Sequence, residues 1–531
     1  MLRTTLFANW CAHPGVVATN AWFKDIPNAE TRFATYEAYL LDGIWKGLAP
    51  HQSEGETPVG PAYHKELEGF IEFAKAIDRW DGFLSFDKIF PQLDSSLLDF
   101  DAKELARTDE LKERMTSGKI AELAAKAAQH EPLIQFPNRE NAVFTKPPMN
   151  YRRAALGLEI LHREAELRTA KAVVVIPHCR MSGAARVAGI VASTLCKKYG
   201  PEEVVVIRTD LDDLQYPEWF PDGVRHLALA GRVADVDPAI RRQTLFHLLR
   251  SLGPEVIFNV NSRLFWDCTT WFATMLREKA KVYAYMFCTD INARGHEAGY
   301  PVEFYYRAYD LLDGMITDSD YLKDRMQHRF MPPDGAVKMQ TLRTPLTDPP
   351  KLVSWPDTET KRRPRIYWAG RFDRQKRIDL VYALAARMPD VDFHLWGAPV
   401  LDDPTKDLVK PANIAMHGSY SGFESLPLSE CDAWLYTAAW DGVPTILLDI
   451  AAAGLPLVCT RVGGTPEALE ADLSWGIDDV EDLAAYETAL REILADLPAA
   501  RAKAAQMSDR IRAKRTEEAY AADLFAFMER T

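Results

Sequence analysis

The chain has 531 residues, of which 47% are hydrophobic and 26% charged, a composition typical of a folded protein with two or three domains. Its net charge of −13 argues against a general nucleic-acid-binding protein, which carries a basic face, so no nucleic-acid partner is expected. Seven scattered cysteines without a C-x-x-C pair indicate neither a disulfide framework nor a zinc site, and a reducing cytoplasm fits them best.

Residues 1–165 are predicted to form a helical accessory region. Apolar residues recur at helical spacing over 33–45 and 63–77, and no recognisable catalytic motif occurs there. Two interpretations stay open for this region, an accessory domain and a scaffold that binds an acceptor or a protein partner. No apolar run reaches the roughly 18 residues that span a bilayer, and no secretory signal is expected, so the predicted location is cytoplasmic.

Residues 166–348 alternate between strand and helix patterns, beginning with the β-branched run at 172–176, which indicates a parallel sheet covered on both faces. A second domain of the same kind is predicted over 349–505. Its strands begin after a proline-rich segment at 345–356. The end of the chain, 506–531, is predicted to be a closing helix. The expected fold class is therefore α/β, with two Rossmann-like domains facing a cleft, because ligands of such sheets bind beyond the carboxyl ends of the strands.

The loop at 177–186 follows the first strand of the middle domain. It contains small residues, among them Ser182 and Gly183, that let a backbone approach a ligand at a helix N-terminus. A tight turn from strand to helix is the alternative explanation of the glycine.

The segment 369–377 directly follows the predicted strand 365–368. Gly370 permits close backbone approach, and Arg371 and Lys376 are cations five positions apart in a loop that opens a helix. This arrangement suits a diphosphate, because a guanidinium binds one with a fork of N–H donors and an ammonium binds it as a point charge. A solvated basic surface loop is the alternative.

Two aspartates eight positions apart follow, Asp441 in the loop Asp441-Gly442-Val443-Pro444 and Asp449 in an apolar helical stretch. An unpaired buried carboxylate is costly, so Asp449 needs a partner. Ribose hydroxyls would supply one, and an ion pair with an arginine or lysine is the alternative. For Asp441 the alternative is a helix N-terminal cap, which aspartate favours.

Further segments continue the series in the same order: His417-Gly418, GLPLV at 454–458 and GGTPE at 463–467. The whole series resembles the C-terminal lobe of family 4 glycosyltransferases of the GT-B fold. The resemblance covers about 170–505, is strongest over 365–470 and is absent before about 165.

The resemblance implies a role for each matching residue. Arg371 and Lys376 match the pair that holds the donor diphosphate and stabilises the leaving phosphate. Asp441 matches the first acid of the paired-acid motif, near the sugar, and Asp449 matches the second, which binds the donor ribose. The implied donor-binding residues are Gly370, Gly418, Asp449, Gly442, Val443, Pro444, Gly183 and Ser182. Relatives are retaining and generally independent of metal, so neither a metal site nor a cofactor is expected.

Two departures from the family pattern bear on this site. The paired acids are usually both Glu, whereas here both are Asp, which is one methylene shorter. The histidine that the family often carries after a middle-domain strand is also missing, because that strand continues as Cys288-Thr289-Asp290. The acceptor-side candidates are therefore His178, Arg186, Thr289, Asp290 and His296.

The resemblance implies a hexosyltransferase-type enzyme of polysaccharide biosynthesis that moves a sugar from a nucleoside-diphosphate sugar to a glycan, lipid-linked or other hydroxyl acceptor. Two alternatives stay open: a sugar-nucleotide epimerase or phosphorylase-like enzyme, and a catalytically degenerate scaffold or nucleotide-sugar-binding protein. The helix expected at 240–252 carries Arg241, Arg242 and Arg250, which suit peripheral contact with anionic lipid at the inner membrane face. An ordinary covering helix is the alternative.

Overall fold

The computed structural model describes residues 117–129, 149–166, 168–234, 236–332, 338–355, 362–399 and 404–531. Most of the predicted helical accessory region, 1–165, lies outside these residues. Two helices of that region are described, α7 (Gly118–Ala128) and α8 (Met149–Glu164). The predicted domain boundaries stay predictions.

The first large unit, which we call the N-lobe, is built on a seven-stranded parallel sheet with the strand order β3-β2-β1-β4-β5-β8-β9. Its central strands are Val- and Ile-rich and buried on both faces, as expected for strands covered by helices on either side. The strands are β1 (Ala172–Ile176), β2 (Val204–Arg208), β3 (Arg225–Ala228), β4 (Val256–Val260), β5 (Lys281–Tyr285), β8 (Gly314–Thr317) and β9 (Met339–Thr341).

Serine side chains start three of the N-lobe helices at the carboxyl edge of this sheet. Ser182, Ser262 and Ser319 cap α9, α11 and α13 by accepting a hydrogen bond from a backbone N–H one turn into each helix. The strand–serine–helix pattern therefore brings several helix N-termini to one edge. The helices are α9 (Gly183–Tyr199), α10 (Pro238–Leu252), α11 (Arg263–Arg277), α12 (Tyr300–Ala308) and α13 (Asp320–Phe330), and a hairpin joins β6 (Asp290–Ile291) to β7 (Glu297–Ala298).

Helix α10 packs between α8 and α11, as a covering helix does. Its arginines have partners within the protein: Arg241 donates to the carbonyls of residues 234 and 236, Arg242 lies over the Trp271 ring, and Arg250 lies over the Phe246 ring. The covering role thus accounts for this helix, and lipid contact stays a prediction. In the part of the chain that the structure describes, no helix has the length and apolar character needed to cross a membrane.

The second unit, the C-lobe, is built on a six-stranded parallel sheet with the order β12-β11-β10-β13-β14-β15. The strands are β10 (Arg365–Ala369), β11 (Asp392–Trp396), β12 (Ile414–Gly418), β13 (Ala433–Tyr436), β14 (Leu457–Thr460) and β15 (Trp475–Ile477). The helices are α14 (Ile378–Arg387), α15 (Thr445–Ala452), α16 (Leu483–Ala495), α17 (Leu497–Lys514) and α18 (Glu517–Arg530). Short 3-10 turns complete both lobes: η2 (Pro201–Glu203), η3 (Pro217–Trp219), η4 (Gly231–Val233), η5 (Phe423–Ser425), η6 (Leu428–Glu430) and η7 (Thr465–Ala468).

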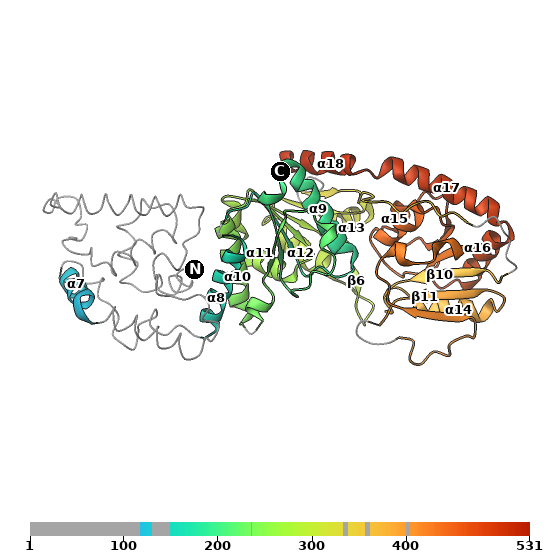
Figure 1. The fold of residues 1–531 in the computed structure, drawn as a ribbon, viewed down its shortest axis with the longest axis horizontal. Helices are drawn as coiled ribbons and strands as arrows, with labels where there is room; N and C mark the ends of the chain where they lie inside the picture. Colours follow the sequence, from blue (N-terminus) through green and yellow to red (C-terminus); the bar gives the residue numbers. More distant parts are fainter. Residues whose placement is uncertain are drawn as a thin grey trace.

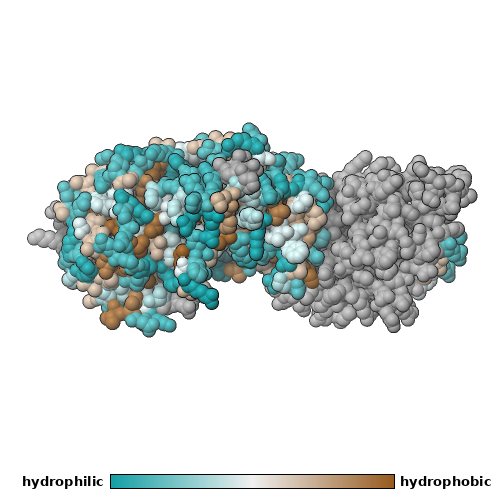
Figure 2. All heavy atoms as spheres, turned by 180° about the vertical axis from the view of Figure 1, so that it is seen from behind, coloured by the Kyte–Doolittle hydropathy of each residue, from teal (hydrophilic) through white to brown (hydrophobic). Residues whose placement is uncertain are grey.

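Both sheets are doubly wound, which confirms the predicted α/β class with two Rossmann-like domains. The strand order reverses between β1 and β4 in the N-lobe and between β10 and β13 in the C-lobe. Ligands of such sheets bind beyond the carboxyl ends of the strands at these reversal points. Figure 1 shows the two lobes side by side, and Figure 2 shows that their opposite face is largely hydrophilic, with apolar side chains in small groups.

The end of the chain forms two helices rather than the single closing helix predicted over 506–531. Thr516 begins α18 by accepting a hydrogen bond from the N–H of Ala519, which interrupts the helix before it. Helix α17 packs against α15 in the C-lobe, whereas α18 packs its Tyr520, Leu524 and Phe527 into the core of the N-lobe. The two helices therefore tie the lobes together, as their path across the top of Figure 1 shows.

Candidate functional site

The reversal points of the two sheets meet where the N-terminus of α9 approaches that of α15. A Cβ atom placed on Gly183 would lie 3.5 Å from Oγ1 of Thr445, which is an ordinary contact distance, so the two lobes lie close together here. Ser182 uses its hydroxyl to cap α9, accepting from the N–H of Ala185 at 3.1 Å. The predicted Ser182–Gly183 loop therefore lies at the junction between the lobes.

Asp449 lies on α15 at this junction and forms an ion pair with Arg186 of the N-lobe. The distance from the Arg186 guanidinium to Oδ2 of Asp449 is 2.6 Å, and the two side chains are 20% and 10% exposed. Arg186 also donates to the carbonyl of Thr347 at 3.4 Å. Burial raises the pKa of the Asp449 carboxyl, and the charge of Arg186 opposes that rise.

The ion-pair alternative for Asp449 thus describes this structure, while its role as a ribose ligand stays a prediction. Arg186, a predicted acceptor-side residue, forms this contact with the C-lobe, and its acceptor-side role stays a prediction. The pairing joins residues 263 positions apart, so neither residue alone revealed it.

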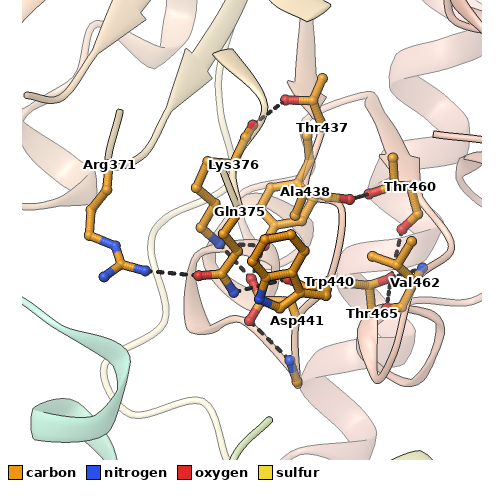
Figure 3. Close-up of polar contacts among 12 residues, drawn as sticks. Arg371, Gln375, Lys376, Thr437, Ala438, Trp440, Asp441, Thr460, Val462 and Thr465 are labelled. Carbon is orange, nitrogen blue, oxygen red and sulfur yellow. Dashed lines mark hydrogen bonds and ion pairs between the residues drawn. The ribbon is translucent and has the colours of Figure 1, made fainter. Parts of the chain in front are cut away.

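Lys376 and Asp441, which Figure 3 labels, form a cluster with Tyr436 at the carboxyl ends of β10 and β13, which we call the Lys376 cluster. The Lys376 ammonium lies 2.5 Å from Oδ2 of Asp441 and 2.7 Å from the Tyr436 hydroxyl. The hydroxyl donates to the same Asp441 oxygen at 2.5 Å. Lys376 and Asp441 are 16% and 14% exposed, and Thr437 donates to the Lys376 carbonyl at 2.7 Å.

Asp441 does not cap a helix, contrary to the alternative interpretation of its sequence position. Pro444 precedes α15, and no side chain accepts a hydrogen bond as its cap. The Asp441 carboxylate turns toward Lys376 instead, and its Oδ1 accepts from the N–H of Gly442 at 3.0 Å. The physical reason is the lysine, because a charged hydrogen bond is stronger than a neutral one.

Arg371 lies beside the Lys376 cluster without touching it (Figure 3), and its side chain is 58% exposed. Its guanidinium donates to Oε1 of Gln375 at 2.8 Å and lies 3.2 Å from Asp373. Gln375 in turn donates to the carbonyl of Trp440 at 2.9 Å, which joins the loops after β10 and β13. The structure thus brings Lys376 to the predicted acid Asp441 but does not bring Arg371 to Lys376.

Asp318, which sequence reasoning did not single out, lies at the end of β8 and is buried against the C-lobe. Its Oδ2 accepts from the N–H of Val443 at 3.0 Å, and no partner for its buried Oδ1 is found among the described residues. Burial, with a smaller contribution from the nearby charge of Asp441, raises the pKa of Asp318 to about 7. A signal existed in the sequence, because an acid directly followed the predicted strand 314–317.

Two glycines and a glutamate complete this contact between the lobes. A Cβ atom on Gly442 would lie 2.6 Å from the carbonyl oxygen of Phe287 and 2.9 Å from Asp318, so only glycine fits there without a shift. A Cβ atom on Gly464 would lie 2.8 Å from Ser319. Glu467, in the predicted GGTPE motif, accepts from the first two N–H groups of α13 at 2.8 Å each.

The remaining predicted residues do not form one cluster. Gly418 ends the edge strand β12 with φ at +72°. His178 accepts from the N–H of Arg180 at 3.3 Å, and burial lowers the pKa of its imidazole. Thr289 is buried, whereas Asp290 and His296 are exposed on the β6–β7 hairpin. That hairpin also reaches the C-lobe, because Arg374 donates to the carbonyl of Ile291 at 3.1 Å.

The C-lobe matches a known family. Residues 363–496 match the family model described as glycosyl transferases group 1. The structure is also similar to that of HepE from Anabaena in complex with UDP and glucose, with 11% identity, a TM-score of 0.53 and coverage of 68% of this chain and 99% of that one. The family match and the fold together support a GT-B glycosyltransferase.

Another GT-B structure, sucrose-phosphate synthase from Thermosynechococcus elongatus, is 15% identical with a TM-score of 0.52, over 68% of this chain and 98% of that one. The chain spans only 58% of TarM, to which it is 12% identical over 54% of its own length with a TM-score of 0.44. A comparison with curated proteins found no match.

Within this GT-B architecture, the matched segment 363–496 contains the Lys376 cluster and Asp449, whereas Arg186 and Asp318 lie outside it. Among the described residues no group of three or more His, Cys, Asp or Glu side chains could hold a metal ion. The expectation that neither a metal nor a cofactor is needed stays a prediction.

Proposed function

We propose that this chain is a retaining glycosyltransferase that moves a hexose from a nucleoside-diphosphate sugar to a hydroxyl group of a glycan or a lipid-linked acceptor. The reaction class in this proposal, glycosyl transfer, is supported by the group 1 family match over 363–496. The donor is proposed to bind mainly to the C-lobe, and HepE, whose structure contains UDP-glucose, has a similar fold.

The proposal depends mainly on the position of the Lys376 cluster at the point where the C-lobe sheet reverses its strand order. Its lysine and aspartate follow β10 and β13, the neighbouring strands at which the C-lobe sheet reverses its order. This is where α/β sheets bind nucleotides, and the segment lies within the family match. An ammonium that is only 16% exposed there suits a phosphate, because low exposure strengthens its field.

The proposed chemistry needs little from the protein beyond charge placement. As the glycosidic bond breaks, negative charge grows on the leaving β-phosphate, and Lys376 stabilises that charge more in the transition state than in the ground state. Arg371 serves the same phosphate after rotating away from Gln375, since its side chain is 58% exposed and free of the core. The N-terminus of α9 adds N–H dipoles from the other lobe.

Asp449 is proposed to hold the donor ribose through its Oδ1, while Oδ2 stays with Arg186. The acceptor is proposed to bind along the N-lobe edge that carries His178, Thr289 and Asp290. The acceptor hydroxyl attacks the anomeric carbon from the face from which the nucleoside diphosphate leaves, and its proton passes to the leaving phosphate. The new glycosidic bond therefore retains the anomeric configuration. The close contact between the lobes at Gly442 limits water, and therefore hydrolysis, at the reacting carbon.

The test begins with a thermal-shift screen of nucleotide sugars, because a ligand that binds the native state raises the melting temperature. With the donor so identified, Lys376→Ala should lower turnover by about 10²–10³-fold. Lys410→Ala, which changes an exposed lysine of the same lobe, is the matched control and should retain activity. Near-normal turnover in Lys376→Ala would refute the assignment.

Two further measurements separate the alternatives. Calorimetry with UDP and GDP tests the scaffold interpretation, because a protein that binds no nucleotide has lost the donor site. Product analysis with donor and no acceptor tests the epimerase and phosphorylase interpretations, which require a changed sugar nucleotide or a sugar phosphate. A transferase gives neither product in quantity, and yields a glycoside only when an acceptor is added.

A further inference from the structure

Tyr436 contributes a buried hydroxyl to the Lys376 cluster that the proposed function does not use. The residue ends β13, is 2% exposed and packs its ring in the C-lobe core. Its hydroxyl accepts from the Lys376 ammonium at 2.7 Å and donates to Oδ2 of Asp441 at 2.5 Å. The ammonium also lies over the ring, 4.8 Å from its centre.

We propose that Tyr436 is a positioning residue, which acts on the donor through Lys376 and Asp441 rather than by touching it. This inference rests on the proposed function, because it concerns how the same ammonium is aimed.

A lysine ammonium has three N–H donors at fixed angles around one nitrogen. With Asp441 as its single partner, Lys376 could rotate about that bond, and its other donors would sweep a cone. The Tyr436 hydroxyl takes a second donor, which stops the rotation and fixes the direction of the third. A donor fixed before the reaction stabilises developing charge without a reorganisation cost.

The same hydroxyl also acts on the carboxylate. Asp441 neutralises Lys376 at 2.5 Å, which reduces the field that a phosphate would feel. The Tyr436 hydroxyl donates to the same Oδ2 and so partly offsets the negative charge on that oxygen. More of the positive field of the Lys376 ammonium then reaches a bound ligand. Burial and the adjoining Asp441 both raise the pKa of Tyr436, so the phenol keeps the proton that it donates.

A purely structural role is the competing explanation, since a large buried ring is needed for packing in any case. Phenylalanine would keep the ring and remove only the hydroxyl. The C-lobe also contains a matched control, Tyr486 on α16, whose phenol is fully buried and has no hydrogen-bond partner among the described residues. Its replacement by phenylalanine removes the same atom from the same lobe without touching the cluster.

The experiment compares Tyr436→Phe with Tyr486→Phe in the full chain, using the donor found by thermal shift. We expect Tyr436→Phe to lower kcat about 10- to 100-fold, with KM changed less than about 3-fold, because the aimed donor acts mainly in the transition state. Tyr486→Phe should leave both constants near the wild-type values. Melting temperatures of both variants show whether folding is intact.

A double-mutant cycle decides whether Tyr436 acts through the lysine. If it does, adding Tyr436→Phe to Lys376→Ala should lower kcat by less than about 2-fold further, since no ammonium remains to be aimed. A further loss as large as that of the single variant would overturn the proposal, and so would equal kcat values for the two phenylalanine variants. Failure of the proposed function is distinct, because the wild type would then transfer no sugar.

Discussion

Replacing Arg186 with alanine tests whether the contact between the lobes rests on a buried charge. The arginine comes from α9 of the N-lobe and pairs at 2.6 Å with Asp449 of the C-lobe. Removing it leaves a carboxylate that is 10% exposed without its counter-charge. Truncating one partner of a buried ion pair is costly, because the remaining charge stays desolvated.

The magnitude follows from the burial of the two side chains. Breaking a fully buried pair from one side costs about 3–5 kcal/mol. Because Arg186 and Asp449 keep 20% and 10% of their exposure, we expect a smaller loss, about 2–3 kcal/mol in the free energy of unfolding near neutral pH. The same loss appears as a further rise in the pKa of Asp449, because the charged carboxylate no longer has its counter-charge.

That correspondence predicts a pH dependence with a definite sign. The folded-state pKa of Asp449 is already above its ordinary value of 3.8, and the variant raises it further. A carboxyl of raised pKa destabilises the fold at high pH and stops doing so once it is protonated. The deficit of Arg186→Ala relative to the wild type should therefore be full at about pH 8 and shrink toward about pH 5.

Denaturant unfolding at both pH values measures this deficit, with Arg180→Ala as the control. Arg180 lies in the loop that precedes α9 and pairs with Asp213 at 2.6 Å, but the two side chains are 47% and 30% exposed, so its loss should cost about 0–1 kcal/mol at either pH. A deficit for Arg186→Ala that equals that of Arg180→Ala, or that does not change with pH, would refute the reasoning.

Two further changes test the same contact between the lobes. Asp318 has its pKa raised to about 7, so the wild type should lose stability as pH rises from about 4 to about 7, by at most about 4 kcal/mol for a rise of about three units. Asp318→Asn should remove this slope in pH-dependent unfolding, and an unchanged slope would contradict it. Gly442→Ala places a Cβ atom 2.6 Å from the carbonyl oxygen of Phe287, so it should separate the lobes. Small-angle scattering should then show a larger radius of gyration with reduced turnover, whereas an unchanged radius would exclude the clash.

The sheets were predictable because short β-branched runs in the sequence indicate their central strands. The run AVVVI at 172–176 coincides with β1, since β-branched residues buried on both faces belong to a covered parallel sheet. The edge strand β3 was not predicted, because its sequence RHLA has one fully buried residue and no β-branched one. Its strand conformation comes from pairing with β2, which is a tertiary cause.

Two members of the Lys376 cluster were singled out from the sequence, but their contact was not predicted. Lys376 and Asp441 were both expected in the donor site, yet their contact spans 65 positions and depends on how β10 and β13 are aligned. Tyr436 gave no signal, because a tyrosine at the end of a buried strand is normally a core residue. Its role becomes visible only when its hydroxyl is found between the two charges.

The two predicted acids share one feature, because each carboxylate is held by a charged partner. Asp441 is met by Lys376 and Tyr436 from its own lobe, and Asp449 is met by Arg186 from the other. Because that second partner belongs to the N-lobe, Asp449 is held in place only while the lobes are together. On the proposed ribose role of Asp449, Arg186→Ala should therefore lower donor affinity as well as stability, because it removes the ion pair that holds the carboxylate.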